Sequence, residues 1–218
     1  MLSCSHPEVP LNVFTSKFAG GRLPMTWYPE SFTEVSMTDM NMRPNPSRGY
    51  PGRTYRFYTG NRVYGFGGGL SYTNFTYKIL SAPSKLSLSG SLSSNSRKRI
   101  LQQGGERLSY ININEITSCD SLRFYMQILV ENVGNMDGGH VVMLFSRVPT
   151  VFRGAPEKQL VGFDRVHTIS HRSTEMSILV DPCEHLSVAN EQGKKIMLLG
   201  GHVLMLGDLE HSVTIQIY

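Results

Sequence analysis

The chain has 218 residues and a formal net charge of +4, and 40% of its residues are hydrophobic while 17% are charged. This composition is typical of folded proteins with a substantial core and excludes a largely disordered chain. The basic residues are scattered apart from one cluster at 97–99, so we expect no nucleic-acid partner. No stretch reaches the ~20 apolar residues of a membrane span, and we expect no membrane partner.

The first region, 1–81, is rich in proline, glycine and aromatic residues, and nine of the 21 aromatic residues lie between Tyr50 and Tyr77. These rings could form a platform for sugars, on which Tyr55 and Tyr58 would be contact residues. Alternatively, they pack a domain interface, which is the commoner situation for aromatic side chains. We favour the interface.

A glycine-rich stretch, RVYGFGGGLSYTNF, spans 62–75. Its spacing matches neither GxGxxG nor GxxxxGK[ST], and an aromatic, strand-like run follows the glycines where a phosphate loop would begin a helix. The sequence therefore disfavours a nucleotide-binding enzyme, and we predict no cofactor.

Serine dominates the next stretch, 82–104, which contains seven serines and the basic cluster at 97–99. Such a composition is typical of flexible connectors, so we predict a linker here.

Short alternating segments fill 105–218. Met126, Ile128 and Val130 recur at period two with polar residues between them, which predicts a half-buried strand. The turn-forming stretch 132–139 and a second apolar run follow it. Further strands are predicted at 108–116, 159–167, 176–180, 195–206 and 213–217. About seven strands at this spacing predict a β-sandwich of the immunoglobulin or fibronectin type III kind.

Three cysteines, Cys4, Cys119 and Cys183, show no CxxC spacing, which argues against a zinc or redox motif. A disulfide between Cys119 and Cys183 and a pair of buried free thiols are both consistent with the sequence.

Catalytic and metal-binding patterns are not evident. A glycosidase needs two positioned carboxyl groups, and Asp39 is the best candidate in 1–81, although we favour an ordinary exposed or capping carboxylate there. Ser71 lacks the context of a nucleophile elbow, His167 and His171 are predicted on a strand and a loop, and Cys183 with His185 is interpreted as a turn. We predict no metal site. Asn74 begins an N-glycosylation sequon, which has meaning only in a secreted protein.

Three ordered motifs carry a family resemblance: GGRLPMTWYPESF at 20–32, GYPGRTYRFY at 49–58 and FGGGLSYTNF at 66–75. Together with the sandwich sequence, they resemble the C-terminal part of plant-type β-D-xylosidases of glycoside hydrolase family 3. The motif residues expected to shape the structure are Gly21, Arg22, Leu23, Pro24, Tyr55, Arg56, Gly67, Gly69, Leu70, Ser71 and Tyr72.

The resemblance implies a domain plan. Residues 1–18 would be a divergent start, 19–81 the incomplete remnant of an α/β sandwich domain, 82–104 a linker and 105–218 a fibronectin type III-like domain. In the family, histidine usually occupies the position of Gly68, so a histidine contact is expected to be lost here.

The resemblance also implies a function. The aspartate nucleophile and glutamate acid/base of the family lie upstream of GGRLP, so this chain is expected to have no catalytic residue and to be an inactive fragment of a xylan-degrading enzyme. The alternative is a non-enzymatic module that binds carbohydrate or protein. Expected partners are a xylan-type polysaccharide or the missing catalytic domain. The family is extracellular, in the plant cell wall, but residues 1–18 contain no secretory signal.

Overall fold

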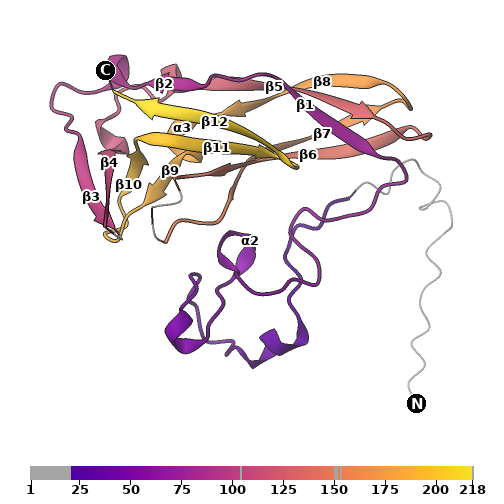
Figure 1. The fold of residues 1–218 in the computed structure, drawn as a ribbon, viewed down its shortest axis with the longest axis horizontal. Helices are drawn as coiled ribbons and strands as arrows, with labels where there is room; N and C mark the ends of the chain where they lie inside the picture. The colour runs from indigo at the N-terminus through magenta and orange to yellow at the C-terminus, as the bar shows by residue number, and fades with distance from the viewer. Residues whose placement is uncertain (1–20, 104, 150–151, 153, 218) are drawn as a thin grey trace.

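The structure is a computed structural model that describes residues 21–103, 105–149, 152 and 154–217. The chain is mainly β, as predicted. Figure 1 shows a β-sandwich across the top of the view and an irregular segment, 21–74, below it. The expectation of a divergent start at 1–18 lies outside the described residues.

The strands form three sheets. The three-stranded sheet contains, in order, β1 (Phe75–Ser81), β5 (Phe124–Asn132) and β8 (Ser173–Val180). The five-stranded sheet contains β2 (Lys85–Ser87), β12 (Leu209–Gln216), β11 (Gly200–Leu206), β6 (Gly138–Arg147) and β7 (Gln159–Thr168). The four-stranded sheet contains β3 (Arg99–Gln103), β4 (Glu106–Asn112), β10 (Lys195–Leu198) and β9 (Ser187–Ala189). Only the β2–β12 pair among these is parallel.

The core lies between the three-stranded and five-stranded sheets. Met126, Ile128 and Val130 of β5 are fully buried, as their period-two spacing predicts, and they belong to one cluster with Leu144 of β6 and Ile215 of β12. A smaller cluster, which includes Phe152 and Ile196, fills the end of the molecule near the four-stranded sheet. The predicted sandwich is thus confirmed, with apolar residues of facing strands forming its interior.

The sandwich begins earlier than the sequence indicates. β1 pairs antiparallel with β5, so 75–81 belongs to the sandwich and not to the preceding region. Residues predicted as a flexible connector form β2, which pairs with β12, and β3, which pairs with β4. Leu88 anchors this stretch because its side chain is 1% exposed in the core. The high serine content does not indicate that this stretch forms strands, because a few apolar residues are enough to anchor a short edge strand.

The predicted strand 195–206 is two strands, β10 and β11, which join different sheets. The chain turns between them at Gly200, whose φ of +117° is strained for any other residue. β9 was not predicted because three residues give no readable alternation.

Segment 21–74 contains short helices and isolated bridges between Trp27 and Tyr64 and between Asn45 and Tyr50. Its helical turns are η1 (Glu30–Glu34), η2 (Pro46–Arg48) and α2 (Thr54–Phe57). The last strands of an α/β domain, expected here, are absent from the described part of this segment. Across the described ranges, no helix has the length and apolar character to cross a membrane.

Candidate interaction surface

Segment 21–74 docks on β6 and β7 through aromatic rings. Tyr55 and Phe66 stack with ring centroids 4.2 Å apart, and both meet the ring of Phe145 on β6 edge to face, at 6.0 and 6.3 Å. The backbone N–H of Leu160 on β7 donates to the Tyr55 hydroxyl at 3.1 Å. The ammonium group of Lys158 lies 4.5 Å from the Phe145 ring centroid. For these rings, the interface interpretation holds.

Polar contacts run beside the rings. Arg56 donates to Gln159 Oε1 at 2.6 Å, and the Arg56 carbonyl accepts from the backbone N–H of Glu157 at 2.7 Å. The Glu157 carboxylate pairs with Arg62 at 3.0 Å. Arg43 donates to the carbonyl of Gly154 at 2.8 Å. The segment is therefore tied to the stretch that leads into β7 at several points of different chemistry.

A second aromatic cluster lies within the segment. The Tyr28 ring stacks on Phe32 at 4.1 Å, and Tyr58 meets both rings edge to face. Tyr58 is only 3% exposed and its hydroxyl donates to the carbonyl of Asn61 at 2.9 Å. Burial raises the pKa of Tyr58. Tyr58, like the stacked Tyr55, therefore does not present a face to a sugar, which corrects the platform interpretation for both residues.

His140 at the start of β6 links the segment to the sandwich, a role that was not predicted from the sequence. Arg22 donates to His140 Nδ1 at 3.1 Å, and the Phe75 ring stacks on the imidazole at 4.3 Å. Since Nδ1 accepts, the neutral ring carries its proton on Nε2, which faces the Tyr77 hydroxyl in a hydrogen bond. Burial, aided by the Arg22 charge, lowers the pKa of His140 to about 4. Its partners are 118 and 63 residues away in sequence, so no local pattern marks the contact.

The glycine-rich loop serves packing. Gly67 has φ +78°, its N–H donates to the Leu23 carbonyl at 2.8 Å, and an added Cβ would lie 2.8 Å from Met143 Sδ on β6. The N–H of Gly68 donates to the Gly65 carbonyl at 3.0 Å. A Cβ on Gly69 would lie 2.8 Å from the Gly21 carbonyl oxygen. These N–H groups are engaged within the protein and are not turned toward a phosphate.

The segment also exposes large apolar side chains, which we call the apolar surface. Trp27 is 49% exposed and Tyr64 57% exposed, with ring centroids 5.7 Å apart, and Leu70 is 93% exposed. Its members are Met25, Trp27, Met37, Met40, Met42, Val63, Tyr64, Leu70 and Tyr72. Trp27 and Tyr64 contact each other within this set, and exposed apolar side chains that lie together mark a candidate interaction site.

The remaining motif residues lie beside this docking region. Leu23 is half-buried, Pro24 and Asn74 are exposed, and Ser71 is half-buried with no partner among the described residues that would make it a nucleophile. Arg22 is the motif residue with the clearest structural contact, since it joins His140 and donates to the Gly69 carbonyl at 2.9 Å.

Asp39 lines a pocket of about 440 Å³ together with Glu34, Tyr50 and Tyr58. Its Oδ1 accepts from the backbone and side-chain N–H of Asn41, and Oδ2 lies 3.2 Å from Arg48. The backbone N–H of Asn41 is the main cause of a lowered pKa at Asp39. This carboxyl is held ionised, which does not suit the general acid of a glycosidase.

Other carboxylates are likewise held by cations. Glu115 pairs with Arg99 at 2.7 Å, and hydrogen bonding from Arg99 lowers the pKa of Glu115 to about 2. Arg147 pairs with Glu210 at 3.0 Å.

Within the described ranges, no three side chains that could bind a metal ion lie together. His171 Nε2 lies 3.1 Å from Asn135 on the surface, and His185 Nδ1 accepts from the Asp181 backbone at 2.9 Å.

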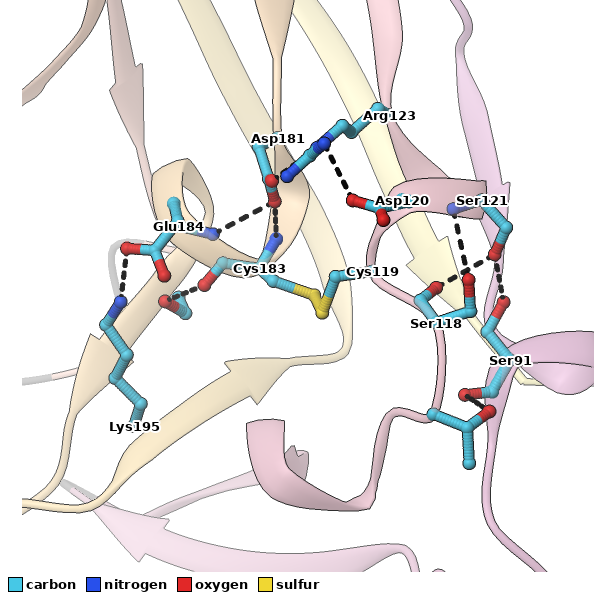
Figure 2. The surroundings of a disulfide bond; sticks show 12 residues. Ser91, Ser118, Cys119, Asp120, Ser121, Arg123, Asp181, Cys183, Glu184 and Lys195 are labelled. Carbon is cyan, nitrogen blue, oxygen red and sulfur yellow. Dashed lines mark hydrogen bonds and ion pairs between the residues drawn. A yellow bond between two sulfur atoms is a disulfide. The ribbon is translucent and has the colours of Figure 1, made fainter.

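The structure joins Cys119 to Cys183, one of the two states that the sequence left open, across 64 residues of chain. Figure 2 shows the bond between η5 (Asp120–Leu122) and α3 (Pro182–His185). Asp181 caps α3 by accepting from the N–H of Cys183 at 3.0 Å, and Arg123 bridges Asp181 and Asp120, each at 2.7 Å. Carboxylates in this region therefore stabilise a crosslinked corner of the sandwich.

Comparison with known proteins agrees with this architecture. The fibronectin type III-like domain family matches residues 140–209. The chain is 58% identical to "Probable beta-D-xylosidase 6" of Arabidopsis thaliana, over 90% of this chain and 25% of that protein. It is 39% identical to "Beta-xylosidase/alpha-L-arabinofuranosidase 2" of Medicago sativa subsp. varia, over 90% of this chain and 24% of that protein. The chain thus spans about a quarter of the length of these relatives.

A solved structure is similar as well. A GH3 exo-β-xylosidase in complex with a xylobiose aziridine activity-based probe superposes with a TM-score of 0.72 at 26% identity, over 90% of this chain and 24% of that chain. Since these matches each cover 90% of this chain, the chain is similar in sequence and fold to the C-terminal portion of plant-type β-D-xylosidases of glycoside hydrolase family 3.

Proposed function

We propose that the chain is a non-catalytic part of a β-xylosidase-like glycoside hydrolase, in which the sandwich and segment 21–74 support a catalytic portion. The observation that carries this proposal is the continuous match of 90% of the chain to about a quarter of β-xylosidases. The substrate class would be xylan or arabinoxylan oligosaccharides, and the place of action the plant cell wall outside the cell.

The lowered pKa values of Asp39 and Glu115 support a lack of hydrolysis by the chain alone. A retaining glycosidase needs one carboxyl that stays protonated and a second that attacks the sugar, about 5 Å apart. Asp39 and Glu115 have lowered pKa values, and Asp181 is occupied by a helix cap and by Arg123. We expect the purified chain to release no product from an aryl β-xyloside, measured against heat-denatured chain. Turnover above that control would contradict the proposal.

The apolar surface supplies the contact with the catalytic portion. Trp27 and Tyr64 are held in register because Trp27 donates its backbone N–H to the Tyr64 carbonyl at 2.8 Å and accepts from Val63 at 2.9 Å. Their rings are thus presented by a fixed backbone. Aromatic side chains of this kind commonly anchor protein interfaces.

This contact can be tested with the chain and the part of the Arabidopsis relative that the chain does not match, expressed separately. We expect the two to co-elute, and the double variant W27A/Y64A to weaken the complex by at least tenfold. The control is the double variant Y125A/F163A, which removes rings 58% and 67% exposed on the sandwich itself. Failure of the wild-type pair to associate, or equal weakening by the control, would contradict the proposed contact.

The alternative, a carbohydrate-binding module, is favoured by the same two rings, because an exposed Trp and Tyr can stack on sugars. In that case the chain alone would be retained on xylan, and W27A or Y64A would lose retention while Y125A/F163A would keep it. Variants at Tyr55 or Tyr58 are not informative here, because those rings pack inside the protein.

A further inference from the structure

Asn74, Phe75 and Thr76 form the acceptor triplet for N-linked glycans, which is Asn, any residue but Pro, then Ser or Thr. The sequence contains one other Asn-x-Ser/Thr triplet, at 45–47, and its middle residue is Pro46. The chain therefore offers a single usable acceptor.

Strand alternation turns the two polar residues of the triplet outward. Asn74 and Thr76 are exposed, whereas Phe75 and Tyr77 are half-buried and contact His140. Successive residues of an extended chain point to opposite faces, so the acceptor amide and the hydroxyl share the solvent face of the sheet.

The fold uses the backbone of Asn74 and leaves its side chain free. The Asn74 carbonyl accepts from the Val133 N–H at 2.9 Å, and the preceding Thr73 hydroxyl donates to the buried Asn132 at 2.5 Å. Within the described part of the chain, the Asn74 amide has no hydrogen-bond partner. A substituent on its Nδ2 would break no contact of the folded state.

The exposed position of Asn74, immediately before β1, leaves room for a bulky group. β1 is an outer strand of the three-stranded sheet, whose order is β1-β5-β8. Figure 1 shows the chain entering the sandwich through β1, at the end of segment 21–74. A glycan at this point would also shield the sheet edge from pairing with another chain.

The disulfide supplies an independent observation about the compartment. Cys119 and Cys183 are joined across 64 residues, and such bonds form and persist in oxidising compartments such as the endoplasmic reticulum. N-linked glycans are attached to secreted proteins on the same route. A chain that acquires this disulfide there is exposed to the glycosylation machinery.

We propose that Asn74 carries an N-linked glycan. In the transfer, Asn74 Nδ2 attacks the sugar C1 of a lipid-linked pyrophosphate oligosaccharide, the donor supplied by the host membrane. A C–N bond forms as the C–O bond to phosphate breaks, the amide loses one proton, and the lipid pyrophosphate leaves. The modification requires only passage through the secretory pathway, so it holds whether or not the chain acts in xyloside hydrolysis.

The test is secretion of the 218-residue chain from cultured human cells behind a cleavable signal peptide. Peptide-N-glycosidase F removes the glycan and converts the modified asparagine to aspartate. We expect the treated wild type to migrate faster, and the peptide containing residue 74 to carry aspartate. N74Q and T76A are expected to migrate like the treated wild type, whereas the matched variant T76S keeps the acceptor and the glycan.

A crosslinked Cys119–Cys183 peptide in a non-reducing map establishes that each variant has folded. An unmodified asparagine at position 74 in secreted, disulfide-bonded wild-type chain would overturn the proposal. So would an unchanged mobility shift in N74Q.

Discussion

The sandwich and segment 21–74 hold their shapes by different means. The sandwich has paired strands, a core of fully buried aliphatic residues and a disulfide. The segment has isolated bridges, short helical turns and half-buried aromatic rings that pack against Phe145 of β6. A region with its own buried core can be stable by itself, whereas a region without one depends on what it packs against.

The largest expected effect comes from the disulfide. The double variant C119S/C183S should lose about 4 kcal/mol of the free energy of unfolding, because the bond closes a loop of 64 residues. Urea unfolding without reductant would measure the loss. The wild type in reductant should fall to the same value, and a loss under ~1 kcal/mol would show that the sandwich does not depend on the crosslink.

Leu144, fully buried in β6, tests the core itself. L144A should lose about 3 kcal/mol through lost burial and a remaining cavity. L70A is the matched control in the segment, and it should change the free energy of unfolding by less than ~0.5 kcal/mol, because Leu70 is already 93% exposed. Equal effects of the two variants would remove the difference between the regions.

His140 tests the junction through pH. Its pKa is about 4 in the folded state, against an ordinary value of 6.5, so the unfolded chain takes up the proton first as pH falls. The stability from the neutral ring is complete above pH 6.5 and is lost as pH falls toward 4, by about 2–3 kcal/mol. H140N should flatten this part of a pH series of urea unfolding.

The control for that series is F163A, which removes an exposed ring of β7 that does not titrate. It should keep the wild-type slope between pH 6.5 and 4. A slope unchanged in H140N would mean that another group causes the pH dependence.

Phe66 gives the smallest and most local effect. F66A removes the stack on Tyr55 and should loosen the segment by about 1–2 kcal/mol while leaving the core intact. Hydrogen exchange of the Leu160 amide, which donates to Tyr55, would then be faster, and that of core amides in β5 unchanged. F163A, which removes an exposed ring of β7, is the control and should leave the exchange of Leu160 unchanged.

The local sequence pattern predicted the sandwich well, because the alternation of apolar and polar residues in a strand depends on neighbouring residues. Met126, Ile128 and Val130 are an example. It failed for the stretch 82–104, where serine-rich composition hid β2 and β3, and for the boundary before β1. Pairing with β12 or β5 depends on strands far along the chain, and no local signal records it.

The sequence by itself determined the β-sandwich class, the family resemblance and the glycosylation triplet, because each depends on residue types at fixed spacing. Only the tertiary structure decided which rings are buried, that Arg22 and Tyr77 meet at His140, and that Cys119 reaches Cys183. Those contacts join residues that are 63 or more positions apart in sequence, so they form only when the chain has folded.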